Sequence, residues 1–559
     1  MRKYLLYLLF LFLGACANIV TPSGGAKDIL PPVPLKAFPP SWSIDFKENS
    51  IKIDFNEYIK ITDAASQVVV SPFMKIAPEL KLRGKSVVVD LMDTLKPNTT
   101  YTVSFGNAIS DITENNTLSN YRYVFSTGNI IDSLMLKGSV KNAFTLKPES
   151  GLLVMLYDHT EDSVPCKETP LYISKTNESG TFSLTNVRSG KYKIFALRDM
   201  NSNYLFDQPN EKIAFIDSLV FPEAIDTAKV DTAKKDSIGK NKSRLRWIDL
   251  YLFEEIPSTQ RLLKMYAAQY GKLVFTFRKP VQNISFKPLS ENITDPWNLQ
   301  EINTTKDTVS LWMKNPDMDS LTLQISDNNV ILDTAEIQLI KKDAAKNRGK
   351  GDAINKNIQL QINASGRSKF DFYKSLFIES STPLALAEFN KIILKENKDT
   401  VKPTFLFTDS IKRIVRMDYK WKEGTAYSLF IPPGTFKDIL GLSNDTTKID
   451  FQTSALKDYG NIKMKLKSDT LNCKLIVQLV TENDVMVQEK YSATNEIVKF
   501  DYVLPDNYKI KLICDVNGNK KWDTGDYFKK ILPEKIYYYP SSIQIRTNWD
   551  MDMDWEIAE

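Results

Sequence analysis

Apolar and polar residues alternate along much of this chain, in short runs separated by turn-forming residues. Such alternation places every second side chain on the same face of an extended strand. Because the runs recur at short spacing without long helical patterns between them, they predict an all-β chain of tandem β-sandwiches. The clearest runs are SIKIDF (50–55), KSVVVDL (85–91), TYTVSFG (100–106) and NYRYVFSTG (120–128).

The spacing of the runs and the length of the chain define the expected organisation. At 559 residues the chain is too long for a single hydrophobic core. Residues 222–244 and 343–356 carry few apolar side chains, so we expect them to be polar linkers between domains. The expected segments are a signal peptide (1–15), a tether (16–37), a first sandwich (38–128), a second sandwich (133–221), a linker (222–244), a third sandwich of unassigned type (245–342), a linker (343–356), a fourth sandwich (357–456) and a fifth sandwich (459–559).

Two patterns repeat along the chain in the same order. Residues 190–211, GKYKIFALRDMNSNYLFDQPNE, align without a gap on residues 506–527, DNYKIKLICDVNGNKKWDTGDY. The fourth and fifth sandwiches are therefore expected to repeat the first and second. The matching positions upstream of these stretches are Tyr101 and Tyr427, Asp111 and Asp438, and Phe125 and Phe451.

Both repeated sandwiches resemble known module families. PNTTYTVSFGNAISDITENN (97–116), with the closing FST (125–127), resembles the bacterial Ig-like domain of S-layer and Bacteroidota envelope proteins. The second sandwich resembles the prealbumin-type, carboxypeptidase-regulatory-like module. That resemblance implies a non-catalytic spacer or binding unit. It is carried by Gly138, Val154, Leu156, Thr176, Gly180, Phe182, Leu184, Gly190, Tyr192 and Ile194.

The N-terminus predicts export and a lipid anchor. A short basic start is followed by an apolar run of about ten residues, which fits a signal peptide and is too short to span a bilayer. The next residues, LGAC (13–16), resemble a bacterial lipobox, and this resemblance implies lipidation of Cys16. No later apolar run is long enough to cross a membrane, so we expect the mature protein to be anchored to a membrane and not threaded through it.

The start of the mature sequence extends the resemblance. CANIVTPSGGAKDILPP (16–32) resembles the opening of a family of Bacteroidota outer-membrane lipoproteins, with Ser23 and Ala26 where the family has Thr and Pro. The resemblance implies lipid attachment to the outer membrane, and other outer-membrane proteins as partners. The surface or periplasmic face stays open, because residues 17–20 lack the acidic side chains that often follow the lipidated cysteine in surface lipoproteins of this phylum.

Composition argues against several functions. The formal net charge of +5 is small for this length and the charges are interspersed, so nothing predicts binding to nucleic acid. A single histidine, His159, argues against a His-ligated zinc site or a His-based catalytic triad. The sequence has no nucleophile elbow, zinc-protease motif, phosphate-binding glycine loop or Cys-x-x-Cys pair. We therefore expect no enzymatic activity.

Two loops carry a candidate calcium-binding pattern. A calcium loop offers oxygens at positions 1, 3, 5, 9 and 12, and a backbone carbonyl at position 7. Position 6, a glycine in the EF-hand, is Tyr204 in one loop and Lys520 in the other, which slightly favours the alternative, an Asx-rich turn that binds its own backbone. A bound Ca²⁺ would be structural. The candidate ligands are Asp199, Asn201, Asn203 and Asp207, and then Asp515, Asn517, Asn519, Asp523 and Asp526.

The linker at 222–244 carries a candidate O-glycosylation pattern. The triplets DTA, DTA and DSI in the linker at 222–244 resemble the O-glycosylation acceptor of exported Bacteroidota proteins, with compositional bias as the alternative. The acceptors would be Thr227, Thr232 and Ser237.

Beyond Cys16 the chain has three cysteines. Cys473 and Cys514 lie in one expected module, where they could form a disulfide or be buried thiols. With Cys166 the number is odd, so at least one cysteine is unpaired.

Two functions fit these features. Repeated spacer-type modules on a lipid anchor favour a non-catalytic scaffold or accessory subunit of an envelope machine, for outer-membrane protein assembly or secretion. The alternative is a surface adhesin or glycan-binding lipoprotein, which predicts a solvent-exposed aromatic groove. We favour the scaffold, because no recognisable sugar-binding motif is present and aromatics in a β-rich chain are mostly core residues.

Overall fold

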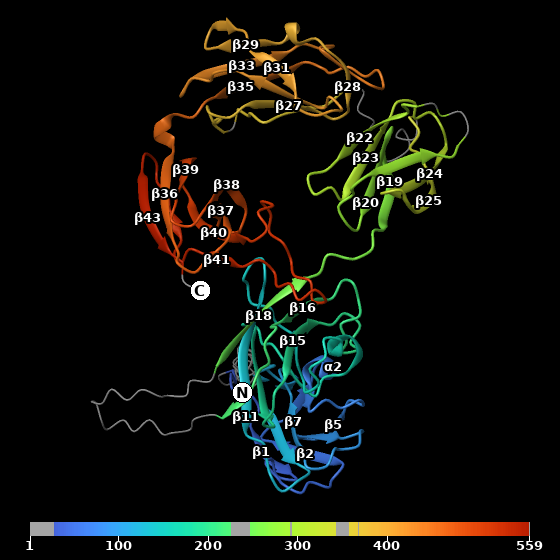
Figure 1. Ribbon diagram of the computed structural model, residues 1–559, viewed down its shortest axis with the longest axis vertical. Helices are drawn as coiled ribbons and strands as arrows, with labels where there is room; N and C mark the ends of the chain where they lie inside the picture. Colours follow the sequence, from blue (N-terminus) through green and yellow to red (C-terminus); the bar gives the residue numbers. More distant parts are fainter. Residues whose placement is uncertain are drawn as a thin grey trace, which may run out of the picture. The chain divides into compact units, whose positions relative to one another are not determined.

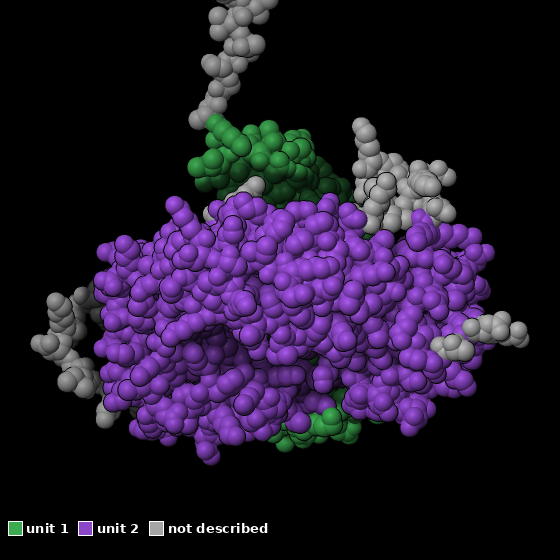
Figure 2. All heavy atoms as spheres, turned by 90° about the horizontal axis from the view of Figure 1, so that it is seen from above, with its two compact units in different colours: residues 1–254, 527–530 green, residues 255–526, 531–559 purple. Residues whose placement is uncertain are grey.

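The computed structural model describes residues 27–224, 246–290, 293, 295–342, 357–366 and 368–557. These residues are almost entirely strands and turns (Figure 1). The chain divides into two compact units, coloured separately in Figure 2, which are residues 1–254 with 527–530 and residues 255–526 with 531–559. Within the described ranges, no helix is long and apolar enough to cross a bilayer.

In the part of the chain that the structure describes, five modules are distinguished, each by a hydrophobic core of its own. The alternation seen in the sequence explains them, because one face of each strand is apolar. In the run 50–55, for example, Ile51, Ile53 and Phe55 are buried whereas Lys52 between them is exposed. The structure therefore confirms an all-β chain of tandem sandwich modules.

The first module contains three small antiparallel sheets around one core. Their strand orders are β1-β2-β6-β5, β10-β7-β4 and β3-β8-β9. The elements are β1 (Pro34–Phe38), β2 (Ser50–Phe55), β3 (Ile59–Ile61), α2 (Ala64–Gln67), β4 (Val69–Ser71), β5 (Glu79–Arg83), β6 (Ser86–Asp90), β7 (Thr100–Ser104), β8 (Ile109–Asp111), β9 (Thr117–Leu118) and β10 (Arg122–Ser126).

The second module is built on the strand order β13-β12-β15-β16-β18-β11-β14, with β17 also paired to β11. Its elements are β11 (Leu134–Asn142), β12 (Leu153–Tyr157), α3 (Val164–Lys167), β13 (Tyr172–Lys175), β14 (Thr181–Val187), β15 (Lys193–Arg198), β16 (Lys212–Phe215), β17 (Glu223–Ala224) and β18 (Trp247–Glu254).

One expected boundary is wrong. The sequence assigns residues from 245 onward to the third sandwich, but β18 pairs in parallel with β11 and antiparallel with β16 (Figure 1). Ile248, Leu250 and Leu252 of β18 belong to the core of the second module. The stretch expected as a linker at 222–244 therefore connects two strands of the second module, and the boundary lies after Glu254.

The second unit begins with the third module, whose sheets have the orders β19-β20-β23-β22 and β21-β24-β25. The fourth module follows with the orders β26-β27-β32-β31, β28-β34 and β30-β29-β33-β35. The strands of the third are β19 (Leu262–Gln269), β20 (Lys272–Phe277), β21 (Ile284–Pro288), β22 (Asn298–Ile302), β23 (Thr308–Met313), β24 (Ser320–Asp327) and β25 (Val330–Gln338). The elements of the fourth are β26 (Leu360–Ile362), β27 (Leu376–Ser380), β28 (Leu384–Ala387), η3 (Phe389–Lys391), β29 (Ile393–Glu396), β30 (Asp399–Val401), β31 (Thr404–Phe407), β32 (Ile414–Asp418), β33 (Ala426–Ile431), β34 (Phe436–Asp438) and β35 (Thr447–Gln452).

The fifth module repeats the pairings of the second. Strand β36 pairs in parallel with β43 and antiparallel with β39, as β11 does with β18 and β14. A second sheet has the order β38-β37-β40-β41, with β42 paired to β40. The elements are η4 (Leu456–Asp458), β36 (Gly460–Lys467), β37 (Lys474–Thr481), β38 (Met486–Ser492), β39 (Ile497–Val503), β40 (Asn507–Asp515), β41 (Ile536–Tyr538), β42 (Ile543–Gln544) and β43 (Asp550–Glu556).

The first and fourth modules share the details of their cores. Tyr101 stacks on Phe125 with ring centroids 5.3 Å apart, and Tyr427 stacks on Phe451 at 5.6 Å. Each tyrosine hydroxyl accepts a hydrogen bond from the backbone N–H five positions upstream, at 2.8 and 3.0 Å. The repeat in the sequence is therefore a repeat of the fold.

Candidate functional site

The two Asx loops, residues 199–211 and 515–534, begin at the ends of equivalent core strands. Asp199 directly follows β15, and Asp515 is the last residue of β40. The carboxylate of Asp199 accepts hydrogen bonds from the backbone N–H of Ser202 at 2.7 Å and of Tyr204 at 2.8 Å. Each loop thus folds around the carboxylate of its first residue.

The second loop repeats this geometry. The carboxylate of Asp515, which is 1% exposed, accepts hydrogen bonds from Gly518 at 2.7 Å and from Lys520 at 2.9 Å. Position 6 has a left-handed backbone in both loops, with φ of 63° at Tyr204 and 64° at Lys520. A glycine would adopt this conformation without strain, and here the hydrogen bond to the aspartate holds a non-glycine residue in it.

The asparagines connect each loop to its second aspartate. In the first loop, the side-chain amides of Asn201 and Asn203 donate to the two oxygens of Asp207, at 3.2 and 2.8 Å. In the second loop, those of Asn517 and Asn519 both donate to Asp523. The structure therefore brings together the first four predicted residues of each loop.

A buried glutamate closes each loop, and the one in the second loop was not assigned from the sequence. Glu211 is 1% exposed and accepts the backbone N–H of Met200 at 3.2 Å and of Asp207 at 2.9 Å. In the second loop Glu534 does the same for Val516 at 2.8 Å and for Asp523 at 3.0 Å. Burial raises the pKa of Glu534, partly offset by these two N–H groups.

Asp526, predicted at position 12 of the second loop, stays a prediction. Its backbone pairs with that of Ile531, and Glu534 accepts the backbone N–H groups that correspond to those bound by Glu211. The glutamate follows the first aspartate by 12 positions in one loop and by 19 in the other. An insertion before Glu534 hid this residue from a count of fixed spacings.

The donors suit calcium in kind, because carboxylate and amide oxygens are the ligands that Ca²⁺ prefers. In this structure these groups bind one another and the backbone. The oxygens of the first aspartate accept backbone N–H groups, and the asparagine nitrogens donate to Asp207 and Asp523. Across the described ranges, no group of three or more His, Cys, Asp or Glu side chains is arranged to hold a metal ion. Calcium binding stays a prediction.

That prediction can be tested by removing calcium. A ligand that binds only the folded state stabilises it by RT ln(1 + [L]/Kd), or about 2.7 kcal/mol at a concentration of 100 Kd. We expect millimolar CaCl2 to raise the melting temperatures of the second and fifth modules above those in EDTA. Asp207→Ala and Asp523→Ala, each in its own module, should abolish the rise. Equal melting in CaCl2 and EDTA would leave the loops as structural turns.

The cysteines of the fifth module pair. Cys473 and Cys514 form a disulfide with their Cα atoms 5.6 Å apart. Cys514 directly precedes Asp515, so the bridge ties the start of the second Asx loop to the strand that follows Cys473. Cys166 is a half-buried cysteine outside any disulfide.

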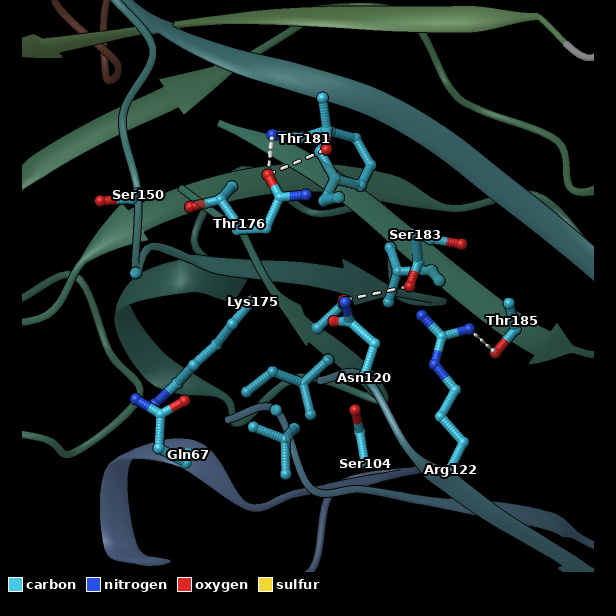
Figure 3. Close-up of a pocket in the computed structure, with 18 of the residues that line it drawn as sticks. Gln67, Ser104, Asn120, Arg122, Ser150, Lys175, Thr176, Thr181, Ser183 and Thr185 are labelled. Carbon is cyan, nitrogen blue, oxygen red and sulfur yellow. Dashed lines mark hydrogen bonds between the residues drawn. The ribbon is translucent and has the colours of Figure 1, made fainter. Parts of the chain in front are cut away.

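A large cavity lies between the first and second modules, inside the first unit (Figure 3). Its volume is about 1070 Å³. Strands β4 and β7 line it from the first module, and β13 and β14 from the second. Most of its side chains carry hydroxyl or amide groups. Lys175 and Arg122 stand at different sides of the cavity, with Ser104 and Asn120 between them (Figure 3).

Burial lowers the pKa of two basic side chains in this cavity. Desolvation lowers the pKa of Lys175, while the charges of Asp63 and Asp199 act in the opposite direction. Desolvation also lowers the pKa of Arg122. Among the described residues that line the cavity, Glu178 is the single carboxylate, against the three cations Arg122, Lys137 and Lys175. The cavity is therefore electropositive and rich in hydrogen-bonding groups.

Several predicted residues lie outside the described ranges. They are the lipid-attachment residue Cys16 and the O-glycosylation candidates Thr227, Thr232 and Ser237. Lipidation and glycosylation stay predictions.

Comparison with known proteins supports the assignment of the first module. Asp111, buried at 1% exposure, accepts three backbone N–H groups of the following turn. Residues 28–127 match the bacterial Ig-like domain family. The resemblance noted in the sequence is thus confirmed for this module. The fourth module has the same stacked tyrosine and a buried aspartate, Asp438, at the matching positions.

Matches to solved structures are weak. The major pilin subunit BcpA of Bacillus cereus is 9% identical over 76% of this chain and 98% of its own, with a TM-score of 0.15. The S-layer protein SbsC is 11% identical over 88% of this chain and 66% of the other, with a TM-score of 0.13. A segment of Escherichia coli alpha-2-macroglobulin is 11% identical over 47% and 95%, with a TM-score of 0.19. Scores this low carry no argument about function, and no curated protein sequence matches the chain.

Proposed function

We propose that this chain is a non-catalytic scaffold or accessory subunit of an outer-membrane machine for protein assembly or secretion, anchored by a lipid on Cys16. The observation that carries the proposal is that consecutive modules within each unit are fixed to each other by specific side-chain contacts. Modules joined only by linkers would move independently, whereas fixed modules hold binding surfaces at set spacings. The lipobox resemblance at LGAC (13–16) supports the anchor.

One such contact joins the third and fourth modules. Arg413 on β32 donates to Glu301 on β22 at 2.6 Å, to the backbone oxygen of Ser380 at 3.0 Å, and to Glu379. The Arg413 side chain is only 13% exposed, and its guanidinium lies 5.6 Å from the ring centre of Trp312. One side chain of the fourth module thus contacts two residues of the third.

A different contact joins the fourth and fifth modules. The rings of Tyr373 and Tyr502 stack at 4.4 Å, and the hydroxyl of Tyr459 donates to Asp371 at 2.5 Å. In the first unit, the buried hydroxyl of Thr102 donates to Asn186 at 3.2 Å. Asn186 and Tyr502 occupy equivalent positions of the second and fifth modules, and both have a left-handed backbone, with φ of 58° and 57°. The same position therefore contacts the preceding Ig-like module in both pairs.

The function is tested by affinity purification of the tagged lipoprotein, gently solubilised from native outer membranes, with counting of the co-purified chains. We expect a reproducible, near-equimolar set of outer-membrane proteins. Recovery of the chain alone would reject the stable-scaffold function.

The rigidity on which the proposal rests gives a separate prediction. Arg413→Met leaves Glu301 without its cation in a partly buried interface, which costs about 1–3 kcal/mol. We expect faster amide hydrogen exchange in β22 and β27, with the cores of both modules unchanged. Arg416→Met is the matched control, because Arg416 on the same strand pairs with Asp418 within its own module. Equal exchange in both variants would show that Arg413 does not fix the interface.

A further inference from the structure

The cavity between the first and second modules plays no part in the scaffold function, and its size and lining suit a ligand. A volume of about 1070 Å³ equals or exceeds that of sites for drug-sized molecules, which are about 300–1,000 Å³. The size is sufficient for a short oligomeric ligand.

The lining defines what such a ligand must offer. Serine, threonine and asparagine side chains from both modules provide donors and acceptors, among them Ser104, Asn120, Thr181 and Ser183. A dense array of this kind matches a ligand that is itself covered with hydroxyl groups. Trp247 at the margin is 53% exposed and offers a ring on which the apolar face of a sugar can stack.

The charges define the ligand further. Within the parts of the chain that the structure describes, no carboxylate forms an ion pair with Arg122, Lys137 or Lys175. Arg122 donates to the hydroxyl of Thr185 at 3.2 Å, and Lys175 donates to the backbone oxygen of Ser66. Asp63 and Asp199 act on Lys175 through their charges but form no ion pair with it, so the partly buried cations of the cavity retain capacity to bind an anion.

The walls are held in place before any ligand arrives. Beneath the cavity, Thr102 donates to Asn186 at 3.2 Å, and Asn186 donates to the backbone oxygen of Asp132 at 2.9 Å. The hydrogen bond from Arg122 to Thr185 also connects the two modules. A preformed site binds more tightly, because little ordering is required on binding.

We infer that this cavity binds an acidic oligosaccharide. Its hydroxyl groups bond to the serine, threonine and asparagine side chains, its carboxylate or phosphate groups pair with Arg122, Lys137 and Lys175, and one sugar ring stacks on Trp247. The site is independent of the scaffold function, since it lies inside one unit of one chain.

The test is isothermal titration of the full-length lipoprotein in detergent with three trisaccharides: trigalacturonate, a phosphorylated mannotriose and neutral maltotriose. We expect at least one acidic trisaccharide to bind at least tenfold more tightly than maltotriose, and the tighter of the two identifies the acid. Binding of none, or equal binding of maltotriose, would overturn the inference. Co-purification of membrane partners is a separate readout, so failure here does not bear on the scaffold.

Variants locate the binding site. Lys175→Gln and Arg122→Gln should each weaken binding of the acidic trisaccharide at least tenfold. Arg83→Gln is the control, because Arg83 is an exposed arginine of the first module outside the cavity. Because Arg122 also joins the modules, hydrogen exchange of the unmodified protein supplies a second readout. The ligand should protect β4, β7, β13 and β14, which line the cavity, and protection confined to other strands would overturn the location.

Discussion

Replacing Cys473 and Cys514 with alanine is expected to lower the free energy of unfolding of the fifth module by about 4 kcal/mol. The disulfide joins residues with a sequence separation of 41. In the chain-entropy model a cross-link stabilises by restricting the unfolded chain, from about 3 kcal/mol for a 15-residue loop to about 4.7 for a 100-residue loop. A loop of this length therefore falls between the two values.

The effect should be localised, because the bridge lies at one end of one sheet. Multidomain chains unfold in several transitions, so the measurement is hydrogen exchange of β37 and β40 amides against denaturant concentration. Cys166→Ala, in the second module, serves as the control. A double alanine variant whose β37 and β40 amides exchange like the unmodified protein would contradict the prediction, and reducing agent alone should reproduce the loss.

Lys511→Met is expected to stabilise the fifth module by about 3 kcal/mol at pH 7. Lys511 is 3% exposed on β40, and burial lowers its pKa from 10.5 to about 8, with the charge of Asp484 acting in the opposite direction. At pH 7 the folded state must therefore hold a desolvated ammonium group. Methionine has a similar length and carries no charge to desolvate.

The pH dependence has a defined sign. Between pH 8 and 10.5 the unfolded chain binds more protons at Lys511 than the folded chain does, so the stability of the unmodified module rises with pH. Burial raises the pKa of Tyr538 to about 12, so stability linked to this tyrosine is lost only above its ordinary pKa of 10.0. The free energy of unfolding should be followed from pH 7 to 9.5. In this range Lys511 titrates and Tyr538 does not, so only the lysine changes the stability.

The control for this prediction is Lys509→Met on the same strand, whose side chain is 33% exposed and pairs with Glu482. The unmodified protein and the Lys509 variant should become more stable over this pH range, whereas Lys511→Met should show a flat profile. A flat profile in all three proteins would show that burial does not shift the lysine.

The sequence predicted strands well because alternation is a local signal. It did not predict which sheet each strand joins. The run WIDLYLFE has the alternation of a strand, but its partner β11 is more than 100 positions earlier, and strand pairing at that distance leaves no local signal. The polar stretch before it was interpreted as a domain boundary for the same reason.

The loop residues were partly predictable from the sequence, whereas the cavity was not. The first four loop residues follow from their spacing, whereas Glu534 follows an insertion and could be recognised only from its contacts. Lys520 adopts a left-handed backbone conformation at a position where a glycine is usual. The strain is offset because the buried Asp515 accepts a hydrogen bond from the Lys520 N–H. The cavity is formed by ordinary serine and threonine side chains of strands and loops, which carry no distinctive pattern.

The position of residues 225–245 has a consequence for proteolysis. They connect β17 and β18, and both strands pair with β11. A protease that cleaves this connection would break the polypeptide and leave the hydrogen bonds of β18 to β11 and β16 in place. The two fragments would then remain associated as a split protein, because β18 of the C-terminal fragment stays inserted in a sheet of the N-terminal fragment.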